Sequence, residues 1–153
     1  MLVFRIADGR FPIFDGQGAA RNGGRWNSVG RPVIYAAETY SGAILEVLVH
    51  LNLGYLPQHQ MAVEITIPDH LTMEILKEAD LPDWDAEDQL ASPTYGDQWL
   101  QKLRTAVLFV PSKVTHGRER NVLLNPNHPD FGKITCSEPH RVSFDQRLVS
   151  RNK

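Results

Sequence analysis

The chain contains 153 residues, of which 42% are hydrophobic, and its formal net charge at pH 7 is −2. That length and composition are typical of one globular domain, so we expect residues 1–153 to fold as a single domain without a linker. Acidic and basic residues are interspersed without a basic stripe, which argues against direct nucleic-acid binding.

The first predicted strand covers residues 2–6 (LVFRI) and contains a charged side chain, Arg5. A guanidinium inside an apolar strand needs a partner or a ligand to offset its desolvation, so Arg5 is a secondary site candidate. The alternative is an edge-strand arginine that reaches solvent. Residues 7–24 are broken by glycines, and we expect them to form an irregular loop over the site.

Residues 21–31 (RNGGRWNSVGR) combine two adjacent glycines with Arg25, Trp26 and Asn27. Exposed backbone donors, a planar cation and an aromatic face suit a nucleotide or another anionic ligand that contains a ring. Neither a Walker loop nor a dinucleotide fingerprint is present. The alternative for this segment is an ordinary solvated loop.

Residues 33–37 (VIYAA) predict a buried strand that delivers Tyr35, and Thr39 or Ser41 can cap the helix that follows. The helical period places one apolar stripe toward the core, formed by Ile44, Val47, Leu48 and Leu51.

Glu46 falls on a second face of the same predicted helix, beside the small residues Gly42 and Ala43. A glycine costs a helix interior roughly 1 kcal/mol relative to alanine, which indicates that something approaches the backbone there. We interpret this face as the wall of a pocket. The alternative is a helix–helix contact with Glu46 solvated at its edge.

The second half of the chain predicts shorter elements. They are a turn at Gly54 and Pro57, a strand over 61–67, an amphipathic helix over 71–79, a helix from Pro93 to about Leu103 capped by Ser92, a strand over 105–110 and a closing strand over 142–148. Strands and helices do not alternate strictly, so the expected fold class is α+β.

Ser112 follows the strand over 105–110, at the strand terminus where α/β scaffolds often carry working side chains. A lone serine is more often a turn residue, and the absence of a Gly-x-Ser-x-Gly elbow argues against a hydrolase nucleophile. Asn121 and Asn125 bracket a short apolar run that ends in turns at Asn-Pro and His-Pro steps.

Cys136 is the only cysteine, which excludes an intrachain disulfide and indicates a reducing compartment. The histidines show no pair at metal-ligand spacing, so we predict no catalytic metal. Because the first residues resemble no signal peptide and no apolar stretch reaches the length of a membrane span, we expect a cytoplasmic protein.

Four segments together resemble the RES-domain family, which comprises toxins of bacterial toxin–antitoxin pairs. They are the GGRWN segment with Arg25, the strand with Tyr35, the S-x-x-x-x-E helix from Ser41 to Glu46, and a late VPS followed by E-x-N-x-L-x-N-P-x-H-P from Glu119 to Pro129. The resemblance covers nearly the whole chain.

The resemblance implies an ADP-ribosyltransferase-like mixed sheet core with flanking helices, and NAD as a substrate with no other cofactor. It carries over Arg25, Tyr35, Glu46 and Ser112 as catalytic residues. It also implies neutralisation by an Xre-class helix-turn-helix antitoxin, which leaves open a higher-order toxin–antitoxin complex. The acceptor stays open between water, phosphate and a protein target.

Cleavage of the nicotinamide–ribose bond builds positive charge on the ribose, which a carboxylate such as Glu46 can stabilise. On this hypothesis Arg25 clamps phosphate, Tyr35 packs on nicotinamide and Ser112 holds a ribose or amide group. The wider substrate-binding set adds Trp26, Asn27, Arg5 and Asn121. A nonenzymatic module that only binds a nucleotide or a partner is the alternative from another class.

Overall fold

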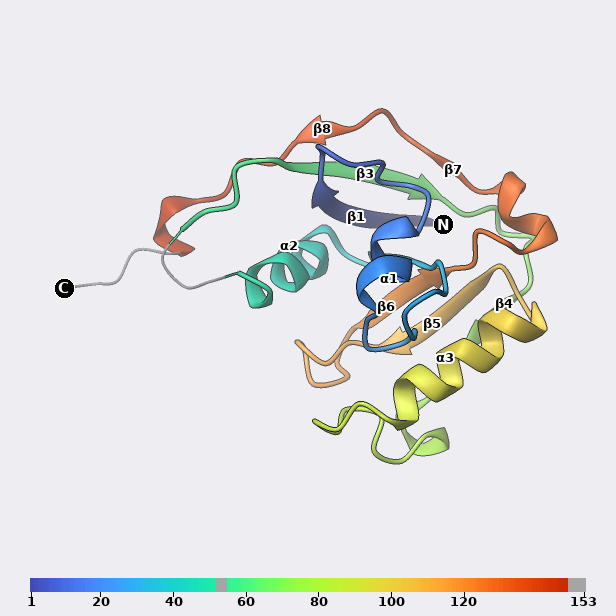
Figure 1. Cartoon of the computed structure of the whole chain (residues 1–153). Helices are drawn as coiled ribbons and strands as arrows, with labels where there is room; N and C mark the ends of the chain where they lie inside the picture. The colour runs from blue at the N-terminus through green and yellow to red at the C-terminus, as the bar shows by residue number, and fades with distance from the viewer. Residues whose placement is uncertain (52–54, 149–153) are drawn as a thin grey trace.

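The computed structural model describes residues 1–51 and 55–148, which form an eight-stranded mixed sheet flanked by helices (Figure 1). The strands are β1 Leu2–Asp8, β2 Ile34–Ala37, β3 Gln60–Thr66, β4 Met73–Ile75, β5 Val107–Pro111, β6 Arg120–Leu124, β7 Thr135–Cys136 and β8 His140–Arg141. The helices are α1 Gln17–Asn22, α2 Tyr40–Val49 and α3 Ala91–Lys102, with 3-10 turns at Glu78–Asp80, Pro129–Lys133 and Gln146–Leu148. The predicted α+β class with a mixed sheet core and flanking helices is confirmed.

The sheet is made of two halves that meet at one point. Its strand order is β4-β5-β6-β2-β1-β3-β7, and β8 also pairs with β3. β1 pairs with β3 along its whole length but with β2 only at Phe4 and Ala37. Figure 1 shows β1 and β3 in one half, β5 and β6 in the other, and α2 beside the junction. One helix can therefore contact both halves.

Strand β5 is the apolar centre of its half of the sheet, and all five of its residues are buried. The predicted strand began at Thr105, whereas the observed strand begins at Val107. The hydroxyl of Thr105 explains the difference, because it accepts a 2.9 Å hydrogen bond from Nε1 of Trp99 on α3 and donates to the carbonyl of Val107. These bonds turn the chain out of helix α3 before β5 starts.

Helix α2 is capped as predicted, since Oγ1 of Thr39 accepts a 2.9 Å hydrogen bond from the Gly42 amide. Its buried residues are Gly42 and Ala43, whereas Ile44 and Val47 of the predicted core stripe are only half-buried. The helix thus approaches the sheet through its smallest residues, and the larger apolar side chains pack at the sides of that contact.

Two predicted elements are wrong. Residues 71–79 contain no α-helix, because residues 73–75 form β4 in parallel register with β5 and the Leu76 amide continues the pairing to the Phe109 carbonyl. Residues 142–148 form no closing strand. Asp145 accepts a hydrogen bond from the Arg147 amide and starts a 3-10 turn, a local bond that competes with strand pairing.

Three further details differ from the predictions. The expected loop over 7–24 contains helix α1, and the apolar run between Asn121 and Asn125 belongs to strand β6. Ser92 does not cap α3, since Leu90 is at the cap position and the Ser92 hydroxyl donates to the Trp84 carbonyl. The predicted turn residue Gly54 lies outside the described residues.

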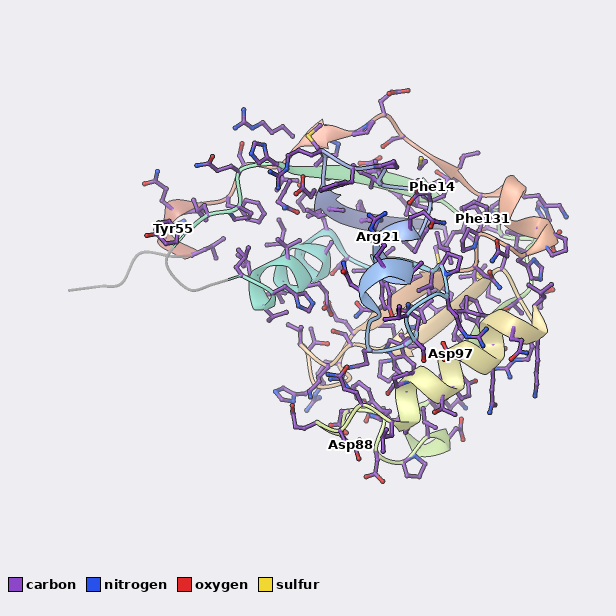
Figure 2. All side chains as sticks on the ribbon, in the orientation of Figure 1. Phe14, Arg21, Tyr55, Asp88, Asp97 and Phe131 are labelled. Atoms are coloured by element: carbon purple, nitrogen blue, oxygen red, sulfur yellow. The ribbon has the colours of Figure 1, made fainter. Side chains whose placement is uncertain are left out.

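Aromatic side chains from two distant segments pack together against the core of the sheet. Phe14 and Phe131 stack with ring centroids 5.2 Å apart, which joins the first loop to the 3-10 turn at Pro129–Lys133 (Figure 2). None of the helices in the described ranges is long and apolar enough to cross a membrane.

Candidate functional site

Glu46 of α2 is the centre of the candidate site. Its Oε1 atom accepts a 2.7 Å hydrogen bond from Nδ2 of Asn121 and a 3.1 Å bond from Oγ of Ser112. Both donors are neutral, and no cation forms an ion pair with Glu46 in the part of the chain that the structure describes. The carboxylate therefore has no cationic partner, and no donor within residues 1–51 and 55–148 reaches its Oε2 atom.

The sheet register explains why Ser112 and Asn121 meet at Glu46. Asn121 is opposite Val110 in the antiparallel pair of β5 and β6. Ser112 is two residues beyond Val110, so its side chain leaves the same face of the sheet. The Ser112 amide donates to the Glu119 carbonyl at 3.0 Å, which extends the pairing by one residue and fixes the direction of the hydroxyl. The predicted position of Ser112 at a strand terminus is confirmed.

Tyr35 lies beside this cluster on the same face. Ala37 is paired with Asn121 in β2 and β6, so Tyr35 is the diagonal neighbour of Asn121, at a separation of about 7–8 Å. Its hydroxyl donates to Oδ1 of Asn27 at 2.7 Å and accepts from the Trp26 amide at 2.9 Å. Burial raises the pKa of the Tyr35 phenol, so the side chain is neutral at physiological pH.

Trp26 and Asn27 are almost fully buried, and their side chains make contacts within the protein. Each has only 2% of its surface exposed. The Trp26 ring stacks on Trp84 at 6.3 Å, and Nδ2 of Asn27 donates to the carbonyls of Ala19, Ser28 and Arg31. Both side chains thus shape the loop, and their direct contact with a substrate stays a prediction.

Helix α3 also contacts the loop that contains Trp26 and Asn27. The Asp97 carboxylate accepts hydrogen bonds from the amide and the hydroxyl of Ser28, and Nε of Arg31 lies 3.6 Å from it (Figure 2). A side chain at Gly96 would collide with the carbonyl oxygen of Trp26 at 1.8 Å, so glycine permits this close approach. Neither residue was predicted, because their partners lie about 70 residues away in the sequence.

Arg25 is half-buried, and its Nη1 atom donates to the carbonyls of Trp84 at 3.2 Å and Ala86 at 3.4 Å. No carboxylate forms an ion pair with it among the described residues, so its charge is available to an anionic ligand. No hydrogen bond links Arg25 to Glu46 in these same ranges. A ligand would have to span the two side chains.

Arg5 lies on the opposite face of the sheet, because its neighbour Phe4 pairs with Ala37 on the face of Glu46. Its Nε donates to the Ile13 carbonyl at 2.7 Å and its Nη1 to the Tyr35 carbonyl at 2.8 Å. Burial lowers the pKa of Arg5 to about 10, an effect that Asp15 partly opposes. The sheet therefore separates the Arg5 side chain from the Glu46 cluster, and Arg5 binds the backbone carbonyl of Tyr35.

A surface cavity of about 450 Å³ adjoins the glycine-rich loop and the start of α3. Its lining includes Gly24, Asn27 and Leu90, and it does not include Glu46, Ser112 or Asn121. Within the described ranges, no group of three or more histidine, cysteine, aspartate or glutamate side chains is placed to hold a metal ion.

Comparisons with known proteins agree on one family. The family model described as "RES domain" matches residues 2–145. The chain is 41% identical to the "Prs ADP-ribosylating toxin" of Sphingobium sp. over 140 residues, which covers 89% of this chain and 86% of that protein. It is 35% identical to a "Toxin Res" of Photorhabdus laumondii over 159 residues, with both chains fully covered.

A solved structure has the same fold. A chain of the M. tuberculosis MbcT–MbcA toxin–antitoxin complex superimposes with a TM-score of 0.73 at 19% identity, covering 93% of this chain and 84% of that one.

Proposed function

The chain belongs to the RES domain family, and on that premise we propose that it is the toxin of a toxin–antitoxin pair and that it cleaves the nicotinamide–ribose bond of NAD. Bond cleavage develops an oxocarbenium-like cation on the ribose, while nicotinamide leaves as a neutral molecule. The reaction therefore requires a negative charge held close to the ribose more than it requires a general acid.

The observation that carries this proposal is the state of the Glu46 carboxylate. Two neutral donors, Ser112 and Asn121, fix Oε1 and leave Oε2 open. An ion pair would cancel the charge, whereas neutral hydrogen bonds orient it. A preoriented carboxylate next to a developing cation is the kind of electrostatic stabilisation that contributes most to many enzymatic rate enhancements.

Arg25 and Tyr35 supply binding in this proposal. Arg25 can exchange its long hydrogen bonds to two carbonyls for bonds to the NAD phosphates, which are stronger because both groups are charged and the contact can be bidentate. The Tyr35 hydroxyl is occupied by Asn27 and Trp26, so only its ring remains for contact with nicotinamide. Tyr35 would therefore act by packing and would not transfer a proton.

The acceptor of ADP-ribose divides two candidate functions. Transfer to water or phosphate would deplete cellular NAD, and this is our first candidate. Transfer to a protein is the second, and it is favoured by the name of the Sphingobium relative, the "Prs ADP-ribosylating toxin". Both functions require the same bond cleavage and the same role for Glu46.

We also propose a cytoplasmic Xre-class helix-turn-helix antitoxin as partner. The "Toxin Res" relatives and the fold shared with a chain of a toxin–antitoxin complex support an antitoxin, and the Xre class rests on the family resemblance.

The test is incubation of the purified chain with NAD, with and without phosphate and with a cell extract, followed by analysis of small molecules and proteins. Free nicotinamide together with ADP-ribose or its phosphorylated form supports depletion. Free nicotinamide together with a protein heavier by one ADP-ribose supports transfer. If no nicotinamide appears under any of these conditions, the proposed function is wrong.

A further inference from the structure

A second carboxylate, Glu119, lies next to the Glu46 cluster. It is two residues before Asn121 and leaves the sheet on the same face, toward α2. Glu119 is half-buried, and no lysine or arginine forms an ion pair with it in the described ranges. A charged side chain in this position is not explained by an ion pair.

The contacts of Glu119 lead to the first turn of α2. Its Oε2 atom accepts a 3.2 Å hydrogen bond from Oγ1 of Thr39, and that same Oγ1 accepts a 2.9 Å bond from the Gly42 amide. The Thr39 hydroxyl proton therefore points at Glu119, which leaves a lone pair for the helix amide. The carboxylate also lies at the positive end of the helix dipole, where negative charge is favourable.

Gly42 leaves the space that this arrangement needs. A Cβ atom there would lie 2.9 Å from Oγ1 of Thr39 and 3.1 Å from Oε2 of Glu119. The close approach that the sequence predicted at Gly42 thus comes from a carboxylate of the protein itself.

Glu119 and Asn121 hold α2 at two successive turns. Two residues along a strand span about 6.6 Å, and four residues along a helix rise about 6 Å, so the spacing from Glu119 to Asn121 matches that from Gly42 to Glu46. Glu119 contacts the first turn through Thr39, and Asn121 contacts the next turn at Glu46. Residues 119–121, at and just before the start of β6, therefore set both the height and the rotation of the helix.

We propose that Glu119 is a positioning residue: it fixes the first turn of α2 through Thr39 and thereby places the Glu46 carboxylate at Ser112 and Asn121. The inference rests on the proposed function for its effect on turnover. The structural part of the proposal, in which Glu119 orients the Thr39 hydroxyl toward the Gly42 amide, does not depend on that function.

The experiment compares Glu119→Ala with Glu119→Gln, whose amide oxygen can still accept the Thr39 proton. Hydrogen exchange of the Gly42 amide reports the cap, and kcat and KM for NAD cleavage report the site. Glu119→Ala should speed Gly42 exchange by up to about fivefold, the size of a lost cap, because the Thr39 hydroxyl is no longer held in the orientation that accepts from this amide. It should lower kcat by about tenfold, because small displacements of a catalytic group are costly, and leave KM nearly unchanged. Glu119→Gln should stay within about threefold of the wild type in both.

Thr39 provides the matched pair, since Thr39→Ser retains the hydroxyl and Thr39→Val removes it. Thr39→Val removes the acceptor itself and should speed Gly42 exchange at least as much as Glu119→Ala, and the double variant should be no worse than Thr39→Val alone. Unchanged Gly42 exchange and kcat in Glu119→Ala would overturn the proposal. So would a Glu119→Gln variant that keeps Gly42 exchange but loses as much kcat as alanine, because Glu119 would then act by its charge on the reaction. Wild-type protein without NAD cleavage contradicts the proposed function instead, and the exchange comparison still decides the role of Glu119.

Discussion

The side-chain amide of Asn121 donates a 2.7 Å hydrogen bond to Oε1 of Glu46, across 75 residues of sequence. Strand β6 thus holds a carboxylate of helix α2 in one orientation. If Glu46 faces the developing cation, loss of this bond should reduce turnover more than substrate binding. The bond links the fold to the proposed chemistry.

Replacing Asn121 tests that relationship. Asn121→Ala should lower kcat for NAD cleavage by roughly tenfold, the effect of an imprecisely held catalytic group, with a smaller change in KM. Asn121→Asp should be more severe, because a second negative charge would repel Glu46. Steady-state kinetics of both variants provides the measurement, and Asn127→Ala is the exposed control. Equal kcat for Asn121→Ala and the wild type would show that Ser112 alone orients Glu46.

Arg25→Lys keeps the charge but loses the fork that can contact two phosphate oxygens. We expect NAD affinity to fall by about tenfold, which corresponds to about 1.4 kcal/mol. Calorimetry in the Glu46→Gln background would measure binding without turnover. Arg21→Lys, on the exposed side of α1, is the matched control (Figure 2). Unchanged affinity in folded Arg25→Lys would assign Arg25 to its contacts with residues 84 and 86.

Tyr35→Phe should destabilise the fold at neutral pH by about 1–3 kcal/mol, because Oδ1 of buried Asn27 loses its donor. The pKa of the Tyr35 phenol is raised in the folded chain, so above about pH 10 the unfolded chain loses this proton first and the wild type loses stability. The difference in unfolding free energy between wild type and variant should therefore narrow from pH 7 to pH 11. Urea denaturation tests this, with exposed Tyr55→Phe as control. A difference that stays constant would contradict burial of the phenol.

The proposed antitoxin should compete with NAD. A toxin that consumes NAD must be silent in the resting cell, and a polar group of the partner that pairs with Arg25 would occupy the donors that NAD phosphate needs. Titration of purified antitoxin against NAD cleavage at several NAD concentrations should give competitive inhibition. Inhibition that saturating NAD leaves unchanged, under conditions where the complex exchanges, would place the partner away from the site.

Much of the local structure is predictable because the signals are local. The apolar run before Pro111 predicts a strand, and the hydroxyl of Thr39 predicts a helix cap. The wrong elements, over 71–79 and 142–148, are those in which pairing with β5 or a side chain bond at Asp145 overrides the pattern of apolar residues. Periodicity carries no information on either of these interactions.

In the candidate site, too, the residues could be predicted from local signals, whereas their long-range contacts could not. The sequence and the resemblance predicted Glu46, Ser112 and Asn121 as site residues, and the register of β5 and β6 brings the three side chains together. Trp26 is of a residue type that often contacts ligands. Its ring instead stacks on Trp84, a contact that no local sequence pattern predicts. In the sequence, Glu119 is only the first residue of the E-x-N motif. Its contact with Thr39 could not be predicted because the two residues are 80 positions apart.

Glu46→Gln tests the central claim most directly, because it keeps the size of the side chain and an oxygen that Ser112 and Asn121 can reach while it removes the charge. The measurement is nicotinamide released from NAD by the purified variant, with Glu64→Gln, an exposed carboxylate on β3, as the control. A charge that stabilises the transition state by about 3 kcal/mol or more predicts a loss of at least roughly a hundredfold in rate, with unchanged thermal stability. Near-wild-type release of nicotinamide by a folded Glu46→Gln variant would contradict the account.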